Sequence, residues 1–387
     1  MRALLAFDKF KDALSAAEAC ERAAAALRSV RPDWELDLCP LTDGGEGFAE
    51  ILTTAAGGTI RRAWVTGPRG ERVEARYGWV AARRIPAAAR RLLDLPAVET
   101  LAVIEMAQAS GLALLSAADR NPWLTTSVGT GELMRLAAAD GAEAILLGVG
   151  GSATNDLGLG ALAALGVEAR TASGAALSPP VPATWEHLAT LAGTAVRLPP
   201  VRIACDVTNP LLGPTGATAV YGPQKGLQPA DFARLEAQAA RVAALVCAHF
   251  GQPEDLAARP GAGAAGGITF GLMAATGAQL LPGAAFVSAW LDLDRRLAAA
   301  DLLLTGEGRF DESSLSGKGP GAVAAQALAA GRSVHVFAGA VAPLPGRPGL
   351  HTHALSPPGL PLAQALAETG WRLDAAVRAA LGPEGGT

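Results

Sequence analysis

The same alternation of strand and helix patterns opens and closes this 387-residue chain. An apolar run at 2–7 precedes a helical pattern at 15–30, and the pair returns at 34–38 and 45–56. Near the end the alternation resumes in the order 302–305, 321–330, 334–337 and 373–381. Strands that alternate with helices pack as a parallel sheet with helices on its faces. The chain is therefore predicted to be an α/β protein.

The middle of the chain has a different pattern. Residues 60–79 alternate as in a two-stranded ribbon, and glycine- and proline-rich loops separate the apolar runs that follow. Because the opening pattern returns only late, we predict that one domain is split by another. A Rossmann-like domain is expected at 1–62 plus 288–387, and an inserted second α/β domain at 63–287. Hinges are expected near 60–70 and 285–295.

Composition excludes several classes of protein. The net charge is −4 and aromatic residues are 5% of the chain, which argues against a general nucleic-acid binder. No apolar run reaches the length of a membrane span, and the start becomes charged too soon for a signal peptide. The four cysteines are far apart and lack the spacing of metal ligands. We expect a cytoplasmic monomer or homodimer with no nucleic-acid or membrane partner.

One stretch of the chain is strongly basic, in contrast to the negative net charge of the whole. Nine arginines lie between Arg61 and Arg91, with only Glu71 and Glu74 as acids. The stretch is either a solvated surface or a positive field that steers anionic substrates.

The clearest chemical signature is the segment Gly148-Val-Gly-Gly-Ser-Ala-Thr-Asn-Asp156, which we call the glycine loop. It follows an apolar run at 144–147 and precedes a helical pattern at 157–165. A strand, a glycine turn and a helix start together favour phosphate binding by backbone N–H groups. Candidate binding residues here are Gly150, Gly151, Ser152, Thr154, Asn155 and Asp156. Alternatively, Asn155 and Asp156 only cap the following helix.

Two dinucleotide fingerprints offer a different interpretation. Gly148-x-Gly-x-x-Ala153 follows a strand pattern, and Glu168 comes about 20 residues later, as in an NAD-dependent dehydrogenase. Gly261-x-Gly-x-x-Gly266 also matches, but no strand pattern precedes it. A non-catalytic regulator that binds sugar acids is a further alternative.

Charged residues follow three strand patterns of the split domain, at 8–11, 42–47 and 305–311. Open α/β sheets bind ligands at the carboxyl ends of their strands. Carboxylates there suit Mg²⁺, and the candidates are Asp43, Glu307 and Asp311. Asp206 follows a strand pattern of the middle region and is placed to be a general base or metal ligand.

Seven ordered motifs together resemble the bacterial glycerate kinases of the first type, from residue 3 to about 340. They are Asp8-Lys-Phe-Lys with Leu14-Ser-Ala, Thr42-Asp-Gly-Gly-Glu-Gly, Gly150-Gly-Ser-Ala-Thr-Asn-Asp, Cys205-Asp-Val-x-Asn-Pro, Gly222-Pro-Gln-Lys-Gly, Pro260-Gly-Ala-Gly-Ala-Ala-Gly-Gly and Thr305-Gly-Glu-Gly-Arg-x-Asp. The resemblance implies ATP- and Mg²⁺-dependent phosphorylation of D-glycerate, usually to 2-phosphoglycerate, with the 3-hydroxyl as the alternative target. It also implies two α/β domains with the active site in the cleft between them. This chain departs from the family pattern at Phe7, Asp12-Ala13 and Thr42, which flank the charged positions.

On this hypothesis Asp206 takes the glycerate hydroxyl proton, with Asp43 as the second candidate. Lys11, Lys225 and Lys318 neutralise the transferring phosphoryl group or hold the glycerate carboxylate. Backbone N–H groups at 150–154 and 261–267 receive the ATP phosphates. The remaining binding candidates are Asp8, Lys9, Gly263, Gly266 and Arg309.

Overall fold

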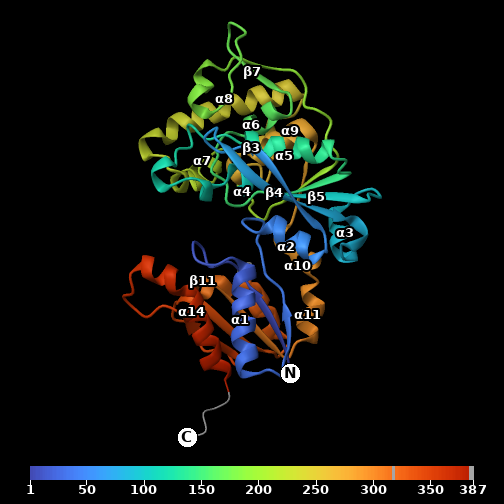
Figure 1. Ribbon diagram of the computed structural model, residues 1–387. Coiled ribbons are helices and arrows are strands. Elements are labelled where there is room, and N and C mark those ends of the chain that lie inside the picture. Colours follow the sequence, from blue (N-terminus) through green and yellow to red (C-terminus); the bar gives the residue numbers. More distant parts are fainter. Residues whose placement is uncertain (316–318, 383–387) are drawn as a thin grey trace. The chain divides into compact units, whose positions relative to one another are not determined.

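The computed structural model describes residues 1–315 and 319–382, and it divides the chain into two compact units (Figure 1). Unit 1 comprises Met1–Asp43 and the chain from Val287 onward, and unit 2 comprises Gly44–Phe286. The first division thus falls at 43/44, not at 62/63, and the expected hinge at 60–70 lies inside a hairpin of unit 2. The reason is that the segment after residue 43 packs on the sheet of unit 2.

Unit 1 is built on a five-stranded, fully parallel sheet in the order β13-β12-β11-β1-β2. Its strands are β1 (Arg2–Phe7), β2 (Glu35–Leu38), β11 (Leu302–Phe310), β12 (Ser333–Val341) and β13 (Leu350–Ala354). The chain adds β2 on one side of β1 and later strands on the other, so the order reverses between β1 and β11. The predicted parallel α/β sheet is confirmed, with the flavodoxin-type strand order in place of the dinucleotide-binding one.

Helices cover this sheet on both faces. Alternate residues of β1 and β11 pack with α1 (Ala16–Val30) and α14 (Leu362–Leu381) in one apolar core, and α13 (Pro320–Ala329) packs on β11 and β12 (Figure 1). The unit also contains α11 (Leu293–Ala299) and α12 (Glu312–Leu315). Helix α1 begins at the predicted capping box, in which the Ser15 hydroxyl accepts from Glu18 N and the Glu18 carboxylate accepts from Ser15 N. Such a cap contributes about 1 kcal/mol.

Unit 2 contains a six-stranded mixed sheet in the order β10-β9-β6-β5-β4-β3. Its strands are β3 (Thr59–Thr66), β4 (Arg72–Ala81), β5 (Thr100–Glu105), β6 (Ala144–Gly148), β9 (Val201–Ala204) and β10 (Gln279–Leu281). The last four are parallel, whereas β3 and β4 form the predicted antiparallel ribbon. A separate hairpin pairs β7 (Glu168–Arg170) with β8 (Thr190–Ala192). The carboxyl ends of four parallel strands therefore share one edge, where their loops meet.

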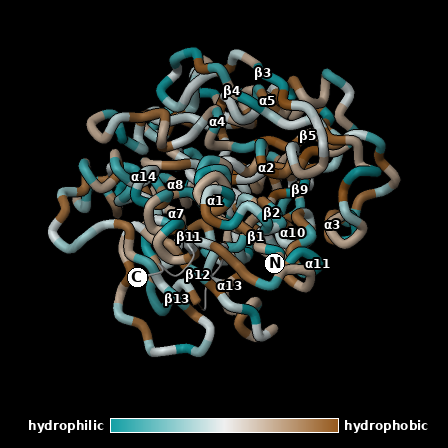
Figure 2. The backbone as a smooth tube through the Cα atoms, turned by 60° about the horizontal axis from the view of Figure 1, so that its bottom comes forward, coloured by the Kyte–Doolittle hydropathy of each residue, from teal (hydrophilic) through white to brown (hydrophobic). Residues whose placement is uncertain are grey.

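Helices α5, α6, α8 and α9 enclose the larger core of unit 2, and α2 packs on β4 and β5 outside that core (Figure 1). The helices of the unit are α2 (Phe48–Ala55), α3 (Ala87–Leu93), α4 (Ala107–Ser110), α5 (Val128–Ala139), α6 (Leu159–Ala164), α7 (Ala217–Tyr221), α8 (Phe232–Phe250) and α9 (Ile268–Thr276), and α10 (Gly283–Leu291) carries the chain onward. Hydrophobic residues are spread along the whole backbone (Figure 2). Among the described residues, no helix has the length and hydropathy needed to cross a membrane.

Candidate functional site

The glycine loop leaves the carboxyl end of β6 and is fixed by backbone hydrogen bonds. Gly150 N donates to Gly44 O at 3.0 Å, and Ala153 N donates to Ser110 O at 2.9 Å. A Cβ atom on Gly150 would lie 2.6 Å from Gly45 Cα, closer than real Cβ contacts come. The glycine at position 150 is thus required for packing on the 44–45 segment, and its N–H is already engaged.

Asp156, at the end of the loop, is fully buried. Its Oδ2 accepts from Ser127 N at 2.7 Å, Ser127 Oγ at 2.8 Å and Gly160 N at 3.2 Å, and its Oδ1 accepts from Gly158 N at 3.1 Å. Burial raises the pKa of this carboxyl, while the hydrogen bonds from Ser127 and the two glycines lower it. Asp156 thus ties the start of α6 to residue 127, in agreement with the capping alternative.

Lys225 lies beneath the glycine loop, with 1% of its surface exposed. Its Nζ donates to Ser152 Oγ at 2.9 Å and to Thr154 O at 2.6 Å. Burial lowers the pKa of Lys225 to about 7, although the Asp156 carboxylate acts in the opposite direction. Lys225, predicted to neutralise the phosphoryl group or hold the glycerate carboxylate, supports the glycine loop from the protein interior.

Two buried polar atoms of the same loop lack hydrogen-bond partners among the described residues, Thr154 Oγ1 and Asn155 Oδ1. The amide of Asn155 is engaged, since its Nδ2 donates to Thr218 Oγ1 at 3.3 Å. Buried polar atoms are nearly always hydrogen-bonded, and leaving one unpaired costs about 1–3 kcal/mol. The two atoms therefore mark the loop as a place where a water or ligand belongs.

Other predicted loops gather around the glycine loop. Gly263 N donates to Asn209 O at 3.0 Å, and Leu157 N donates to Gly266 O at 3.0 Å. A Cβ on Gly266 would lie 2.0 Å from Thr154 O, so the backbones touch there. The segments at 205–210, 222–226 and 260–267 thus form one cluster with the glycine loop. The N–H of Gly263 is engaged within that cluster.

Asp206 follows β9 and is half-buried. Its Oδ2 accepts from Ala284 N, in the first turn of α10, at 2.8 Å. The predicted base is thus also a helix cap, a role that sequence reasoning missed because 78 residues separate the two groups.

In unit 1, three carboxyl groups lie close enough to interact: Asp8 follows β1, Glu307 lies within β11 and Asp311 follows β11, and we call them the acidic cluster. Asp8 N donates to Gly306 O at 3.0 Å, which places Asp8 at the point where the strand order reverses. Burial raises the pKa of Glu307 to about 7; the Asp8 and Asp311 carboxylates act in the same direction, and a hydrogen bond with Ser314 opposes them. Glu307 Oε1 is buried and has no hydrogen-bond partner among the described residues.

Basic residues border the acidic cluster. Lys9 N donates to Asp8 Oδ1 at 2.7 Å, and Arg309 Nε lies 3.5 Å from Asp311 Oδ2. The side chain of Arg309 is 74% exposed, and Lys11 is also exposed. Lys318, a predicted catalytic residue, lies outside the described residues.

Asp43 is exposed and follows a segment that runs beside the end of β1, where Leu41 N donates to Phe7 O at 2.8 Å. Among residues 1–315 and 319–382, no three His, Cys, Asp or Glu side chains are grouped closely enough to hold a metal ion. The predicted trio of Asp43, Glu307 and Asp311 is therefore not a preformed metal cage.

The dinucleotide interpretation has no support from the fold. Glu168 lies in the small β7–β8 hairpin, where its carboxylate accepts from Arg170 on an exposed surface. In a dinucleotide site, the acid would follow a neighbouring strand of the main parallel sheet.

Comparison with known proteins identifies the family. The model of the glycerate kinase family matches residues 3–377. The chain is 39% identical over 333 residues to glycerate 2-kinase of Escherichia coli K12, covering 84% of this chain and 81% of that one. It is 40% identical over 328 residues to glycerate kinase of Bacillus subtilis 168, with coverages of 84% and 81%.

A solved structure agrees with these relatives. The crystal structure of a Salmonella typhimurium LT2 protein assigned as a glycerate kinase 2 superposes with a TM-score of 0.75 at 36% identity, covering 98% of this chain and 97% of that one. The resemblance drawn from the seven motifs is confirmed, and the dehydrogenase and regulator alternatives are set aside. The chain belongs to the glycerate kinase family, whose enzymes are phosphotransferases with an alcohol group as acceptor.

Proposed function

We propose that this protein transfers the γ-phosphoryl group of ATP to D-glycerate and forms 2-phosphoglycerate. The relative from Escherichia coli that carries the name glycerate 2-kinase supports this choice of product. The structural observation that carries the proposal is the glycine loop, supported by Lys225, in which Thr154 Oγ1 and Asn155 Oδ1 are buried and have no partner within residues 1–315 and 319–382.

The glycine loop is the proposed phosphate site. The hydrogen bonds of Gly150 and Asp156 fix its backbone, so that binding requires little reorganisation. The Thr154 hydroxyl would donate to a phosphate oxygen, as would the N–H groups of Gly151 and Ser152. Lys225 holds the loop by its Ser152 and Thr154 contacts and adds positive charge beneath it whenever it is protonated.

Two residues of the acidic cluster, Glu307 and Asp311, are together with Asp43 the proposed Mg²⁺ ligands, and the chemistry of Glu307 fits that ion. Glu307 Oε1 is a buried oxygen with no hydrogen-bond partner in the described part of the chain, and burial and two neighbouring carboxylates oppose the ionised form of Glu307. A hard cation with a preference for oxygen ligands would relieve both effects. Glu307 and Asp311, with Asp43, would hold Mg²⁺, which would neutralise charge on the phosphoryl oxygens.

Glycerate is a small hydroxy acid, so it needs a cation for its carboxylate and an acceptor for its hydroxyl proton. Lys11 and Arg309 are exposed and suited to the carboxylate, with Lys9 and Lys318 as further candidates. Asp206 is the proposed proton acceptor, and Asp43 is the second candidate. In phosphoryl transfer, positioning and charge stabilisation do most of the work of catalysis.

The test is ADP release from Mg-ATP in the presence of D-glycerate, followed by enolase without phosphoglycerate mutase. ADP release together with enolase turnover is the expected result. ADP release without enolase turnover would move the phosphate to the 3-hydroxyl. A lack of glycerate-dependent ADP release would refute the assignment of the substrate.

A further inference from the structure

The arginine-rich stretch separates into two groups in the structure. Six of its nine arginines bond to acidic side chains or backbone carbonyls: Arg61 to Asp140, Arg62 to Glu74, Arg69 to Asp119 O, Arg72 to Trp64 O, Arg76 to Glu50 and Arg84 to Gly57 O. The other three, Arg83, Arg90 and Arg91, form no side-chain hydrogen bond or ion pair with any described residue. The positive charge of the stretch that no described residue balances is therefore confined to Arg83, Arg90 and Arg91.

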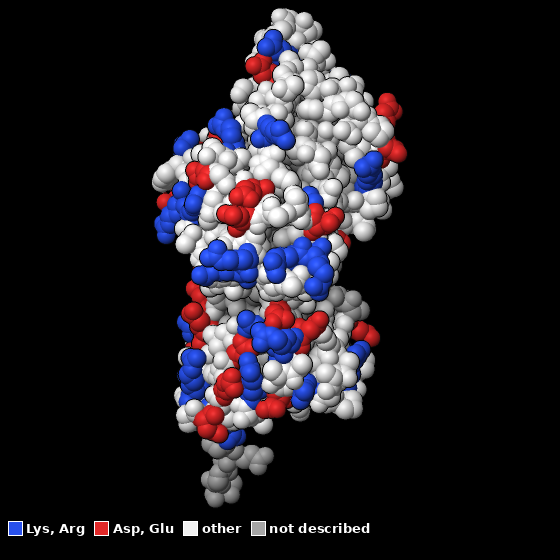
Figure 3. Space-filling model, turned by 90° about the vertical axis from the view of Figure 1, so that its right-hand side faces the viewer, with Lys and Arg blue, Asp and Glu red and all other residues white. Residues whose placement is uncertain are grey.

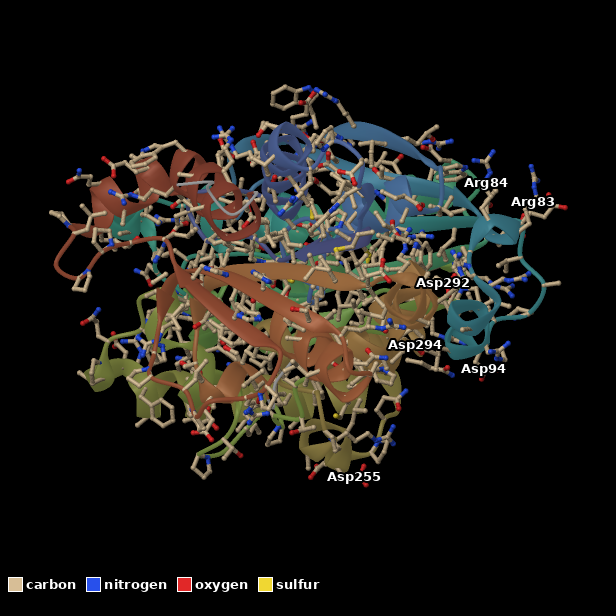
Figure 4. All side chains as sticks on the ribbon, turned by 90° about the horizontal axis from the view of Figure 1, so that it is seen from below. Arg83, Arg84, Asp94, Asp255, Asp292 and Asp294 are labelled. Carbon is tan, nitrogen blue, oxygen red and sulfur yellow. The ribbon has the colours of Figure 1, made fainter. Side chains whose placement is uncertain are left out.

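These three arginines line one cavity of about 490 Å³ beside α3. Its other lining residues are largely apolar, with the buried side chains of Ile85, Leu93 and Leu101 at its base. Basic side chains form a patch on the face that carries α3 (Figure 3), and Arg83 and Arg84 extend outward from the chain just before that helix (Figure 4). The cavity thus has an apolar base and a cationic rim.

The walls of the cavity are held in place. Arg202 Nε donates to Leu93 O at 2.7 Å, and its Nη2 donates to Asp94 O at 2.6 Å, which satisfies carbonyls at the end of α3. The Asp94 carboxylate is not among the lining groups. The end of α3 is therefore held by an arginine that does not line the cavity.

The cavity lies at the amino ends of the parallel strands of unit 2, and the glycine loop lies at their carboxyl ends. Leu101 pairs with Ala144 at the first residue of β6, whereas the glycine loop begins where β6 ends, at Gly148. Ala144 and Gly148 are four residues apart along β6, which corresponds to about 13 Å of strand.

We propose that this cavity binds a small organic anion with an apolar body, such as a medium-chain or aromatic carboxylate. Its size lies within the usual range of ligand pockets, about 300–1,000 Å³. Unpaired guanidinium groups favour carboxylates, and the aliphatic base favours a hydrocarbon body. Glycerate has no apolar part to fill that base, and the proposed ATP phosphate site lies at the other end of β6, so the ligand is distinct from the proposed substrates.

The first test uses the fluorescent anion 8-anilinonaphthalene-1-sulfonate with the full-length protein. It should bind saturably, octanoate should displace it, and neutral octanol should compete at least 10-fold less well. Mg-ATP should not displace it. Displacement by Mg-ATP, or equal competition by octanol, would overturn the proposal.

Variants locate the binding. The triple substitution Arg83→Gln, Arg90→Gln and Arg91→Gln should weaken binding of the dye at least 10-fold. A matched control, Arg28→Gln with Arg135→Gln and Arg197→Gln, makes the same charge change at exposed arginines that do not line the cavity, and it should bind as the parent does. Ala97→Trp, which fills the cavity without changing charge, should abolish binding while circular dichroism and kinase activity are kept. Unchanged binding in either cavity variant would refute the site.

Discussion

Lys225 donates from a fully buried position to Ser152 Oγ at 2.9 Å, so a cation supports the glycine loop from the protein interior. The same ammonium group reaches Thr154 O at 2.6 Å, and thus spans the loop at two points. This arrangement makes the loop geometry depend on a residue that solvent does not reach.

Lys225→Met should therefore damage catalysis without removing any group that touches solvent. We expect kcat/KM for ATP to fall about 100-fold, in the range typical of lost electrostatic groups. Ser152→Ala, which removes only one acceptor of the lysine, should cost less than 10-fold. Steady-state kinetics at saturating D-glycerate measure both, and a Lys225→Met enzyme within threefold of the parent would contradict the supporting role.

Glu307 predicts a pH dependence of stability. Its folded-state pKa of about 7 lies above the ordinary value of 4.5, so the folded protein binds the additional proton more tightly than the unfolded chain does. The stabilisation is complete below pH 4.5 and is lost as the pH rises through about 7. Urea unfolding between pH 5 and 8, without metal, should show this loss in the parent and a flatter profile in Glu307→Gln. If the stability of the parent and of Glu307→Gln changed with pH in the same way, the raised pKa of Glu307 would be contradicted.

If Glu307 is a ligand of Mg²⁺, the ion should counteract the loss of stability that is expected as the pH rises. Bound Mg²⁺ requires the ionised carboxylate, so its effect on the melting temperature should be larger at pH 8 than at pH 5.5. Glu307→Gln should remove most of the Mg²⁺ effect, whereas Glu312→Gln, an exposed neighbour, serves as the matched control. An equal Mg²⁺ effect in parent and Glu307→Gln would place the ion elsewhere.

Asp206 has a structural and a proposed chemical role that two substitutions separate. Asn at position 206 keeps an oxygen for Ala284 N but is not a base, so kcat should fall about 10²–10⁴-fold with little change in stability. Asp206→Ala should show the same kcat loss and also destabilise the protein by about 1 kcal/mol. A near-normal kcat in Asp206→Asn would leave only the capping role.

The sequence was most informative where structure is decided locally. The strand at 2–7 and the capping box at Ser15 and Glu18 are set by neighbouring residues, and both occur as predicted. The gathering of strand-end loops could also be predicted, because parallel strands share a carboxyl edge.

Contacts between distant residues could not be predicted in this way. The glycine at 150 was interpreted as room for a phosphate, yet its tightest neighbour is Gly45, 105 positions earlier. Asp206 caps a helix through the N–H of Ala284, which lies 78 positions later. The domain division at 43/44 depends on where α2 packs, which its own amphipathic pattern does not specify.

The most direct test of the proposed ATP site is the binding of Mg-ATP to Thr154→Val, measured by titration calorimetry beside thermal unfolding. Removing a buried hydroxyl that has no described partner should leave stability unchanged or raise it. Losing its hydrogen bond to a phosphate should weaken ATP binding about 10- to 100-fold. Thr276→Val, whose hydroxyl donates to Leu272 O within a helix, is the matched control and should bind ATP as the parent does. Unchanged ATP affinity in Thr154→Val would contradict the assignment of the glycine loop as the phosphate site.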